Sequence, residues 1–300
     1  MKRPVASPLI TLVVAAVLAP CAVGSIIRDD GTDAGSLALA AMPAFAGTAR
    51  ISVAGGVGSG TLIAPGWVLT AAHVVTNSAG SPLPLGSLTI TVNGESRAVA
   101  EVVVQPGWTG GNFTAGVDLA LVRLSSDVTS VAPAGLFIGP APVSAEAALV
   151  GYGAFGFGSL GFVQPPGSLH GATNTFDALG SALFPTWSSS LILMDFDSPT
   201  TGDYNRSGTT FATALEGVPA TGDSGGGSFI FVDGAWLLAG VHSFTFTTTA
   251  GTAAPGGYGT GAADTLVSAS AAWINSVIPT PSAAIPLLAA MAFNARRRRQ

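Results

Sequence analysis

Residues 59–73 of this 300-residue sequence read SGTLIAPGWVLTAAH. The apolar residues form two short runs, and Pro65 with Gly66 marks a turn between them. The stretch therefore predicts two strands, the second of which ends at Thr70. His73 follows at the junction of strand and turn, where an imidazole is well placed to act as a base.

Two later stretches supply the groups that such a base would serve. Residues 116–122 read GVDLALV, so Asp118 comes directly before an apolar strand, where a carboxylate could be buried and aimed at His73. Residues 222–226 read GDSGG, so Ser224 lies in a tight glycine turn whose backbone N–H groups can converge. Serine is a poor nucleophile, and it needs a neighbouring base, a group that orients the base, and donors for the oxyanion.

These stretches resemble the motifs of the trypsin/chymotrypsin-like serine peptidases, which occur in the same order in that family. The separations are 45 residues from His73 to Asp118 and 106 residues from Asp118 to Ser224. The resemblance extends from about Phe45 to Val277. It implies an all-β fold of two six-stranded antiparallel β-barrels with a short C-terminal helix, and an active site between the barrels.

The resemblance also implies a serine endopeptidase that uses no cofactor or metal and acts on protein or peptide substrates. In this mechanism His73 takes the proton of Ser224, Asp118 holds the imidazole, and an acyl-enzyme intermediate forms. The N–H groups of Gly222 and Ser224 bind the tetrahedral oxyanion. The rival interpretation is a catalytically silent surface binding module, and the presence of all three catalytic groups argues against it.

The α/β-hydrolases also place a nucleophilic serine in a Gly-x-Ser-x-Gly turn, which residues 222–226 fit. In that fold the acid and the histidine follow the serine in the chain, whereas Asp118 and His73 precede Ser224 here. An esterase of that class is therefore not expected.

The substrate preference is predicted less sharply. In the family, the residue six positions before the catalytic serine lies at the base of the pocket for the side chain before the scissile bond. Here it is Val218, which disfavours cleavage after Lys or Arg, although Glu216 lies close in sequence. His242, Ser243 and Thr245 align with the pocket wall. Because glutamyl endopeptidases of the family carry a histidine at the position of His242, both apolar and acidic side chains are expected as alternatives.

Short apolar segments separated by Gly, Pro and Asn predict many strands. One segment, 268–277, has helical periodicity, whereas the glycine-rich stretches 151–161 and 250–261 are interpreted as long loops. Pro and Ala accumulate near 131–142 and mark a boundary. The expected strands are 49–53, 61–63, 67–70, 88–92, 98–104, 119–124, 147–152, 191–196, 228–232, 236–242 and 264–267. The expected organisation is an N-terminal segment at 25–44, a first barrel at 45–135, and a second barrel with the helix at 136–278.

The N-terminal residues 1–24 are predicted to be a signal peptide. Lys2 and Arg3 precede an apolar stretch at 9–18, and small residues then suit a signal peptidase, so the protein is expected to be secreted. The single cysteine, Cys21, lies in this segment, so the mature chain would contain no disulfide. A lipoprotein signal that ends at the cysteine is the alternative.

Residues 279–300 resemble a PEP-CTERM sorting tail, with Pro-Thr-Pro at 279–281, an apolar run at 283–293 and then four arginines. In that family an exosortase recognises these parts and removes the apolar helix during export from a Gram-negative-type cell. The resemblance implies transient anchoring in the inner membrane and a final place at the cell surface or in the extracellular matrix. A retained tail anchor or an unprocessed basic C-terminus is the alternative.

The charge distribution excludes one class of partner. Charged residues make up 9% of the sequence. Between the basic termini, five arginines stand against 16 acidic residues, which gives a formal charge of −11. Because this body cannot neutralise a run of phosphates, binding to nucleic acid is not expected.

Two smaller features lead to expectations about ions. In much of the family the residue before the catalytic serine, here Asp223, pairs with an N-terminal ammonium released by cleavage. A cut after Ser25 would expose Ile26-Ile27, the nearest candidate, and an enzyme that needs no activation is the alternative. Four residues with oxygen ligands suit Ca²⁺ by type but lack the spacing of an EF-hand, so solvated loop acids are expected. They are Asp195, Asp197, Asp203 and Asn205.

Overall fold

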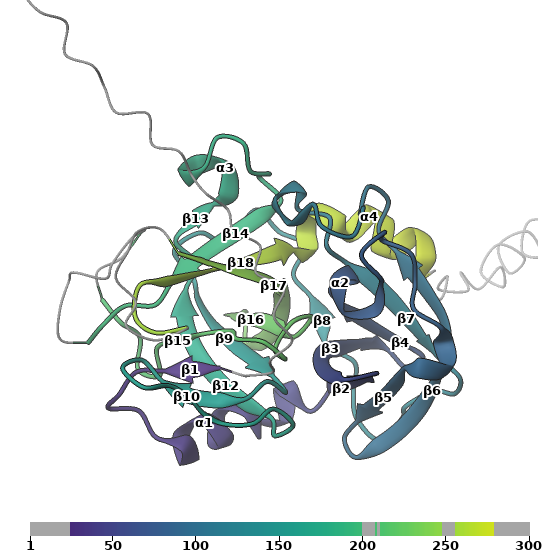
Figure 1. Ribbon diagram of the computed structural model, residues 1–300, viewed down its shortest axis with the longest axis horizontal. Coiled ribbons are helices and arrows are strands. Elements are labelled where there is room, and N and C mark those ends of the chain that lie inside the picture. Colours follow the sequence, from purple (N-terminus) through teal and green to yellow (C-terminus); the bar gives the residue numbers. More distant parts are fainter. Residues whose placement is uncertain (1–24, 200–207, 209–210, 248–255, 279–300) are drawn as a thin grey trace, which may run out of the picture.

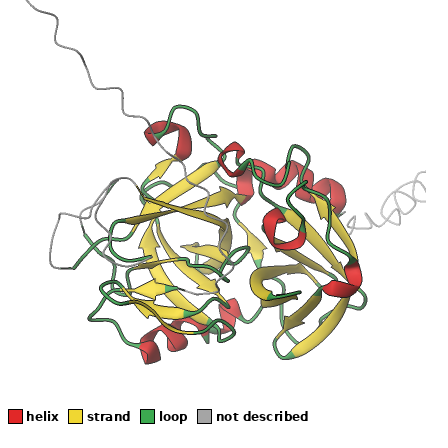
Figure 2. Ribbon diagram, in the orientation of Figure 1, coloured by secondary structure: helices red, strands yellow, loops and turns green. Residues whose placement is uncertain are grey.

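The computed structural model describes residues 25–199, 208, 211–247 and 256–278. Strands dominate, and they gather in two halves that lie side by side (Figure 1). The helices are few and short and lie around the strands (Figure 2). The expected signal peptide and sorting tail lie outside the described residues. Within the described part of the chain, no helix is both long enough and apolar enough to cross a membrane.

The first half is a closed barrel of six antiparallel strands, as predicted. The hairpin between its second and third strands turns at Pro65-Gly66, where Ala64 pairs with Trp67. The last strand in the pairing order returns to the first and closes the barrel. In that order the strands are β2 (Thr48–Val53), β3 (Gly56–Ala64), β4 (Trp67–Thr70), β7 (Ala120–Leu124), β6 (Glu95–Val104) and β5 (Thr89–Val92).

The second half is barrel-like and is built from two sheets. The larger sheet has eight strands, of which seven follow in the order β12 (His170–Thr175), β9 (Glu146–Gly151), β16 (Gly227–Val232), β17 (Ala235–Thr247), β18 (Thr260–Leu266), β14 (Leu191–Asp195) and β13 (Ala178–Leu179). The eighth, β8 (Gly135–Leu136), pairs with β17. The smaller sheet has four strands in the order β11 (Gly161–Gln164), β10 (Phe155–Phe157), β1 (Ile26–Ile27) and β15 (Gly217–Val218).

Strand β1 joins the half of the molecule that is distant from it in sequence. It runs parallel to β10 and antiparallel to β15. Both of its isoleucines are fully buried, which explains why this two-residue strand is held inside the second half. In Figure 1 it appears in purple among the green strands of the second half.

Four α-helices and three short 3₁₀ helices complete the described structure. The predicted helix is α4 (Val267–Val277), whose Val267 and Ile274 belong to a core that also contains Leu121 of the first barrel. Two helices of one turn are α2 (Ala72–Val75) and α3 (Gly180–Leu183), and the 3₁₀ helices are η1 (Pro43–Phe45), η2 (Leu85–Ser87) and η3 (Phe113–Ala115).

The sequence did not predict α1 (Asp33–Ala40), which packs on β12. The side chain of Thr32 caps this helix by accepting a hydrogen bond from the N–H of Gly35, at 3.0 Å. His170, for which the sequence suggested no partner, is buried and meets Asp33 with 2.9 Å between Nε2 and Oδ1. The interpretation of 151–161 as a loop is also wrong in part, because β10 lies there and pairs with β1.

One hydrophobic core connects the two halves. Phe45, at the end of η1, packs against Phe229 of β16 in a tilted arrangement with 4.9 Å between ring centroids, and it meets Trp236 of β17 at 5.3 Å. The same cluster contains Leu62 and Leu69 from the first barrel. This shared packing fixes the two halves relative to each other, and with them any site that takes residues from both.

Candidate active site

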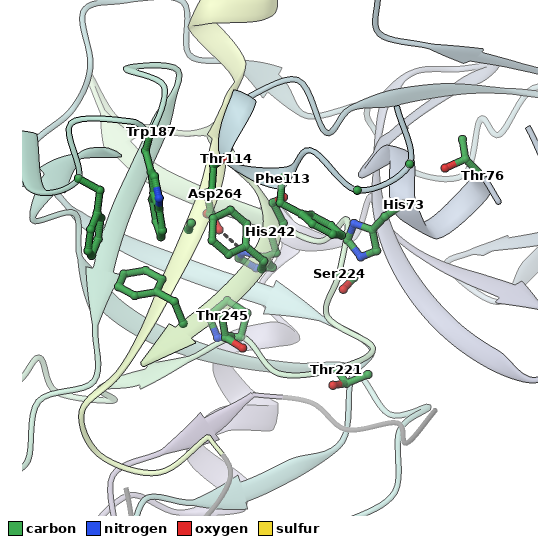
Figure 3. Close-up of a pocket in the computed structure, with 18 of the residues that line it drawn as sticks. His73, Thr76, Phe113, Thr114, Trp187, Thr221, Ser224, His242, Thr245 and Asp264 are labelled. Atoms are coloured by element: carbon green, nitrogen blue, oxygen red, sulfur yellow. Dashed lines mark hydrogen bonds and ion pairs between the residues drawn. The ribbon is translucent and has the colours of Figure 1, made fainter. Parts of the chain in front are cut away.

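A cleft of about 1180 Å³ takes residues from both halves. His73 and Phe113 come from the first half, whereas Ser224, His242 and Thr245 come from the second (Figure 3). The residues predicted from separate stretches of sequence therefore meet in one place.

The pairing of β4 with β7 brings His73 and Asp118 together. Thr70, the last residue of β4, lies opposite Ala120, the first residue of β7. His73 follows the first strand in α2, and Asp118 immediately precedes the second, so their side chains lie at the same end of the barrel. Nδ1 of His73 is 2.7 Å from Oδ2 of Asp118, and the backbone N–H of His73 donates to Oδ1 at 2.9 Å. The carboxylate is fully buried, so it can hold the imidazole without competition from water.

A β-bulge supplies a third group to this pair. On β17 the residues His242 and Phe244 lie opposite Asp264 and Ala263, two consecutive residues of β18, so Ser243 is the extra residue. Its hydroxyl donates to Oδ2 of Asp118 at 2.6 Å. The sequence placed Ser243 in the pocket wall, and the structure adds this contact with the buried carboxylate.

Ser224 lies in a turn that only glycine can complete. Gly225 has a φ of +83°, and a Cβ there would lie 2.1 Å from Oγ1 of Thr70. The N–H of Gly225 donates to the carbonyl of His242 at 2.8 Å, and the N–H of Ser59 donates to the carbonyl of Ser224 at 2.8 Å. The turn is thereby anchored to both halves of the molecule.

The same turn leaves two N–H groups available. The carbonyl of Gly222 accepts from the Ser59 hydroxyl at 2.8 Å. Within the described residues, the N–H groups of Gly222 and Ser224 have no hydrogen-bond partner. Two free donors beside a serine hydroxyl are what an oxyanion requires.

Asp223 supports the turn from inside the protein. Its carboxylate accepts hydrogen bonds from the N–H of Gly153 at 2.9 Å, from the N–H of Ala220 at 3.2 Å and from the Ser25 hydroxyl at 3.1 Å. Burial raises the pKa of Asp223 above its ordinary value. The residue just before β1 therefore reaches the acid next to the serine.

The residues predicted to shape the substrate pocket separate into two groups. His242, Ser243 and Thr245 line the cleft, as expected from the sequence. Val218 does not line it; this residue is fully buried in β15, in the core of the second half. The neighbouring Pro219 lies in the cleft wall instead, because the chain leaves the strand at that point.

Sequence reasoning did not find an aromatic wall on one side of the cleft. Trp187 packs against Phe244 and Phe246, with ring centroids 5.3 and 5.2 Å apart, and stacks on Phe184 at 4.2 Å. Figure 3 shows Trp187 on the side of the cleft away from His73. The alternation of Phe244 and Phe246 on β17 was the available signal, because residues two apart on a strand share a face.

The expectation of solvated acids at 195–205 is wrong for the two that the structure describes. Asp195 and Asp197 are both buried. The N–H of Asp195 donates to the carboxylate of Asp177, its carbonyl accepts from the Asn174 amide, and the residue pairs with Gly261 of β18, so Asp195 is part of the sheet rather than of a free loop. Asp203 and Asn205 lie outside the described residues. Among the described residues, no three His, Cys, Asp or Glu side chains converge as metal ligands would.

This combination of a two-half β fold with an Asp, a His and a Ser at one cleft defines the chymotrypsin-like class of proteins. The family model described as Trypsin matches residues 40–273, and the chain belongs to this family. Chymotrypsin-like elastase family member 1 from Canis lupus familiaris is 38% identical over 73 residues, and the protein of that name from Felis catus is 41% identical over 73 residues. These matches span 23% of this chain and about a quarter of each relative, 28% and 27%.

Among solved structures, neuropsin, a serine protease expressed in the limbic system of mouse brain, has a similar fold. The TM-score is 0.55 at 18% identity, over 77% of this chain and 94% of neuropsin. The likeness therefore concerns the fold, and it extends across both halves.

Proposed function

We propose that this protein is a serine endopeptidase that hydrolyses peptide bonds through an acyl-enzyme intermediate. The observation that carries the proposal is the buried Asp118 held at 2.7 Å from Nδ1 of His73, in the cleft that Ser224 lines. This contact fixes the imidazole so that its other nitrogen, Nε2, is left to accept the serine proton. In Figure 3 the Ser224 side chain lies beside the imidazole of His73.

The steps follow from the groups in place. His73 removes the proton of the Ser224 hydroxyl as the oxygen attacks the substrate carbonyl, and the free N–H groups of Gly222 and Ser224 receive the negative charge. The protonated His73 then gives its proton to the leaving amine, and a water molecule repeats the sequence to release the acid. Elastase family member 1 and neuropsin, the named relatives, support this chemistry.

For the substrate, we propose a side chain other than Lys or Arg before the scissile bond. Among the described residues that line the cleft there is no acid except Asp264, and its two carboxylate oxygens are engaged by His242 and Ser228. A basic side chain would thus find no free carboxylate. An apolar or an acidic side chain remains as the alternative.

We further propose export and trimming at both ends. A signal peptidase would cut beside Ser25, and an exosortase would remove the tail at 279–300, so that the peptidase acts outside the cell or at its surface. A cut just before Ser25 would leave an α-ammonium on the residue whose hydroxyl already reaches Asp223. Mass spectrometry of the secreted protein reads both ends; a mature chain that still contains residues 1–24 would contradict this part of the proposal.

The test of the peptidase function uses the mature secreted protein, its Ser224→Ala variant and a Ser276→Ala control. Ser276 is an exposed serine of α4, so its loss should leave activity unchanged. Each protein is incubated with a diverse peptide mixture, and cleavage sites are identified by mass spectrometry. Loss of Ser224 should lower turnover by roughly 10⁴-fold or more. Undiminished cleavage by Ser224→Ala would show that the activity belongs to another group or another protein.

A further inference from the structure

Arg50, on strand β2, has no carboxylate partner among the described residues. Its Nη1 donates to the hydroxyl of Ser52 at 2.7 Å, and this is its hydrogen bond within that part of the chain. A guanidinium offers five N–H donors, so most of them remain for a ligand. The other described arginines pair with an acid or lie over a tryptophan ring, namely Arg28, Arg97 and Arg123.

The strand register places Arg50 beside the turn that carries Ser224. Arg50 lies directly opposite Ser59 of β3, and opposed residues of antiparallel strands project from the same face. This face is the outside of the barrel, because the neighbouring Ile51 is fully buried in its core. At Ser59 the second half covers the face, since the hydroxyl donates to the carbonyl of Gly222 and accepts from the N–H of Tyr152. Arg50 is thus one strand away from the covered residue.

The guanidinium of Arg50 leans along β2 toward the hairpin that joins β2 to β3. Its partner Ser52 lies opposite Val57, whose carbonyl oxygen is 3.7 Å from the position that a Cβ on Gly222 would take. Burial raises the pKa of Tyr152, and the positive charge of Arg50 opposes this rise, so the guanidinium and the phenol lie within electrostatic reach of each other. These residues therefore border one region beside the oxyanion turn.

This region lies outside the cleft. None of the described residues that line the cleft comes from β2, from the start of β3 or from 152–167. The cleft wall at 242–245 is where the side chain before the scissile bond is expected. The chain after that bond must then leave on the other side of Gly222, between Val57 and Pro166, which lies 3.5 Å from the same Cβ position. Arg50 stands beside this exit.

An extended chain brings the second residue after the scissile bond within reach of Arg50. Such a chain rises about 3.3 Å per residue, and neighbouring strands lie about 4.8 Å apart. The first residue after the bond therefore lies over Val57, while the second can reach the guanidinium on the next strand. A dipeptide leaving group would end at the same place, with its C-terminal carboxylate.

We infer that Arg50 makes the leaving side of the active site a receptor for a carboxylate, so that the enzyme favours an acidic side chain or a chain terminus at the second residue after the scissile bond. The inference rests on the proposed peptidase function. The planar fork of a guanidinium binds a carboxylate through two parallel N–H donors, which gives both affinity and direction. A lysine at the same substrate position would meet a like charge.

The first test compares peptides that differ only at the second residue after the scissile bond. Amidated peptides carry Glu, Gln or Lys there, and a fourth peptide ends at Gln with a free carboxylate. The proteins are the mature wild type, Arg50→Gln and a control, Arg123→Gln, which removes the same charge from an exposed position of β7. The wild type and the control should cleave a carboxylate peptide with the highest kcat/KM and the Lys peptide with the lowest.

The ratio of each carboxylate peptide to the Gln amide is the quantity that decides. Arg50→Gln should lower this ratio by about threefold to tenfold. A ratio that falls for the Glu amide identifies the side chain as the source of the carboxylate, and one that falls for the free acid identifies the terminus. Equal rates on all four peptides in the wild type, or a preference that Arg50→Gln retains, would overturn the inference.

A nitroanilide substrate separates recognition from a structural role. It carries the residues before the scissile bond and none after it, so Arg50 has nothing to contact. The loss caused by Arg50→Gln should therefore be larger on the carboxylate peptides than on the nitroanilide. Equal losses on both would show that the substitution disturbs the turn at Gly222, and that Arg50 recognises no part of the substrate.

A binding measurement distinguishes failure of this inference from failure of the peptidase function. The Ser224→Ala chain is titrated with the leaving dipeptides Ala-Glu amide, Ala-Gln amide and Ala-Gln, while ¹⁵N NMR follows the guanidinium groups. A carboxylate dipeptide should bind tighter than Ala-Gln amide and shift the resonances that Arg50→Gln removes. Such binding without wild-type cleavage would refute the peptidase and keep the receptor. Ser224-dependent cleavage without a carboxylate preference would do the reverse.

Discussion

The cleft holds two Asp–His pairs with the same local design and different surroundings. In each, Nδ1 of the histidine faces an aspartate that also accepts a serine hydroxyl: Asp118 accepts from Ser243, and Asp264 accepts from Ser228. The side chain of His73 is 23% exposed, whereas that of His242 is 3% exposed. Exposure lets the first imidazole exchange protons with a reacting group, while burial keeps the second away from solvent and from such exchange. The burial of the histidine side chain, rather than the residue types in the pair, therefore decides whether an Asp–His pair can exchange protons with a reacting group.

The largest expected difference between the two pairs is in kcat, when the aspartate of each pair is replaced by asparagine. Asp118→Asn should lower kcat about 10⁴-fold for every substrate, because the imidazole is then held in the wrong tautomer. Asp264→Asn should leave kcat nearly unchanged, because the imidazole that Asp264 holds is buried. Steady-state kinetics of both variants on the same peptides checks this contrast. Equal losses on all substrates in both variants would show that the two pairs form one catalytic unit.

Removing the serine hydroxyl that contacts each aspartate should give a smaller difference in kcat of the same kind. Ser243→Ala removes one hydrogen bond to a buried carboxylate, worth about 1.5–3 kcal/mol, so kcat should fall by roughly 10- to 150-fold if the whole of that energy acts in the transition state. Ser228→Ala removes the corresponding bond at Asp264 and should leave kcat nearly unchanged. The two variants control for each other, since both delete a buried hydroxyl. The idea fails if Ser228→Ala slows cleavage as much as Ser243→Ala does.

The first of these pairs was accessible to sequence reasoning, and the second was only half accessible. His73, Asp118 and Ser224 stand in short motifs next to strand ends, and the pairing of β4 with β7, which the motifs alone do not give, brings the first two together. His242 was singled out by the family resemblance, but its partner Asp264 was not. That contact depends on the strand register of β17 and β18, which a bulge at Ser243 shifts, and no local pattern encodes such a shift.

The elements that sequence reasoning missed lack a clear local signal. Helix α1 reads DAGSLALA and has eight residues, too few for a helical period to stand out. Strand β10 lies within a glycine-rich stretch that has the composition of a loop. Both are held by tertiary contacts, α1 through Asp33 and His170 and β10 through its pairing with β1, so their stability does not come from local preference.

A substitution at Gly240 tests how firmly Asp264 is held in place, through its effect on the free energy of unfolding. Gly240→Ala would press a methyl group against Oδ2 of Asp264, 2.7 Å away, and should cost about 1–3 kcal/mol of unfolding free energy. Gly86→Ala is the matched control, because nothing lies within 4 Å of its added Cβ. Urea denaturation of both variants measures the difference. Equal stability of the two would mean that Asp264 moves aside at no cost, and that its position over β17 is loosely held.

The last effect concerns Glu216, a buried carboxyl outside both pairs. Burial raises the pKa of Glu216 from 4.5 to about 8, and its carboxylate accepts from the N–H and hydroxyl of Thr213 rather than from an imidazole. Between these two values the folded state keeps a proton that the unfolded state releases, so stability falls as pH rises through this window. Glu216→Gln should reduce this loss of stability at high pH. Each kcal/mol that is retained corresponds to about 2–4 °C in Tm. Thermal unfolding at pH 5 and pH 8.5 tests it; parallel curves for the variant and the wild type would assign the slope to other groups.

The hydrogen bond from Ser25 to Asp223 joins residues 198 positions apart, and strand β1 is completed only by segments that follow the whole first barrel. Contacts of such large sequence separation form slowly, because a long loop must close before they contribute. The turn that carries Ser224 thus acquires its final support after nearly the entire chain has been synthesised and has begun to fold. A nascent or half-folded molecule therefore lacks the finished turn, so the proposed peptidase activity would arise only after the synthesis of the chain is nearly complete.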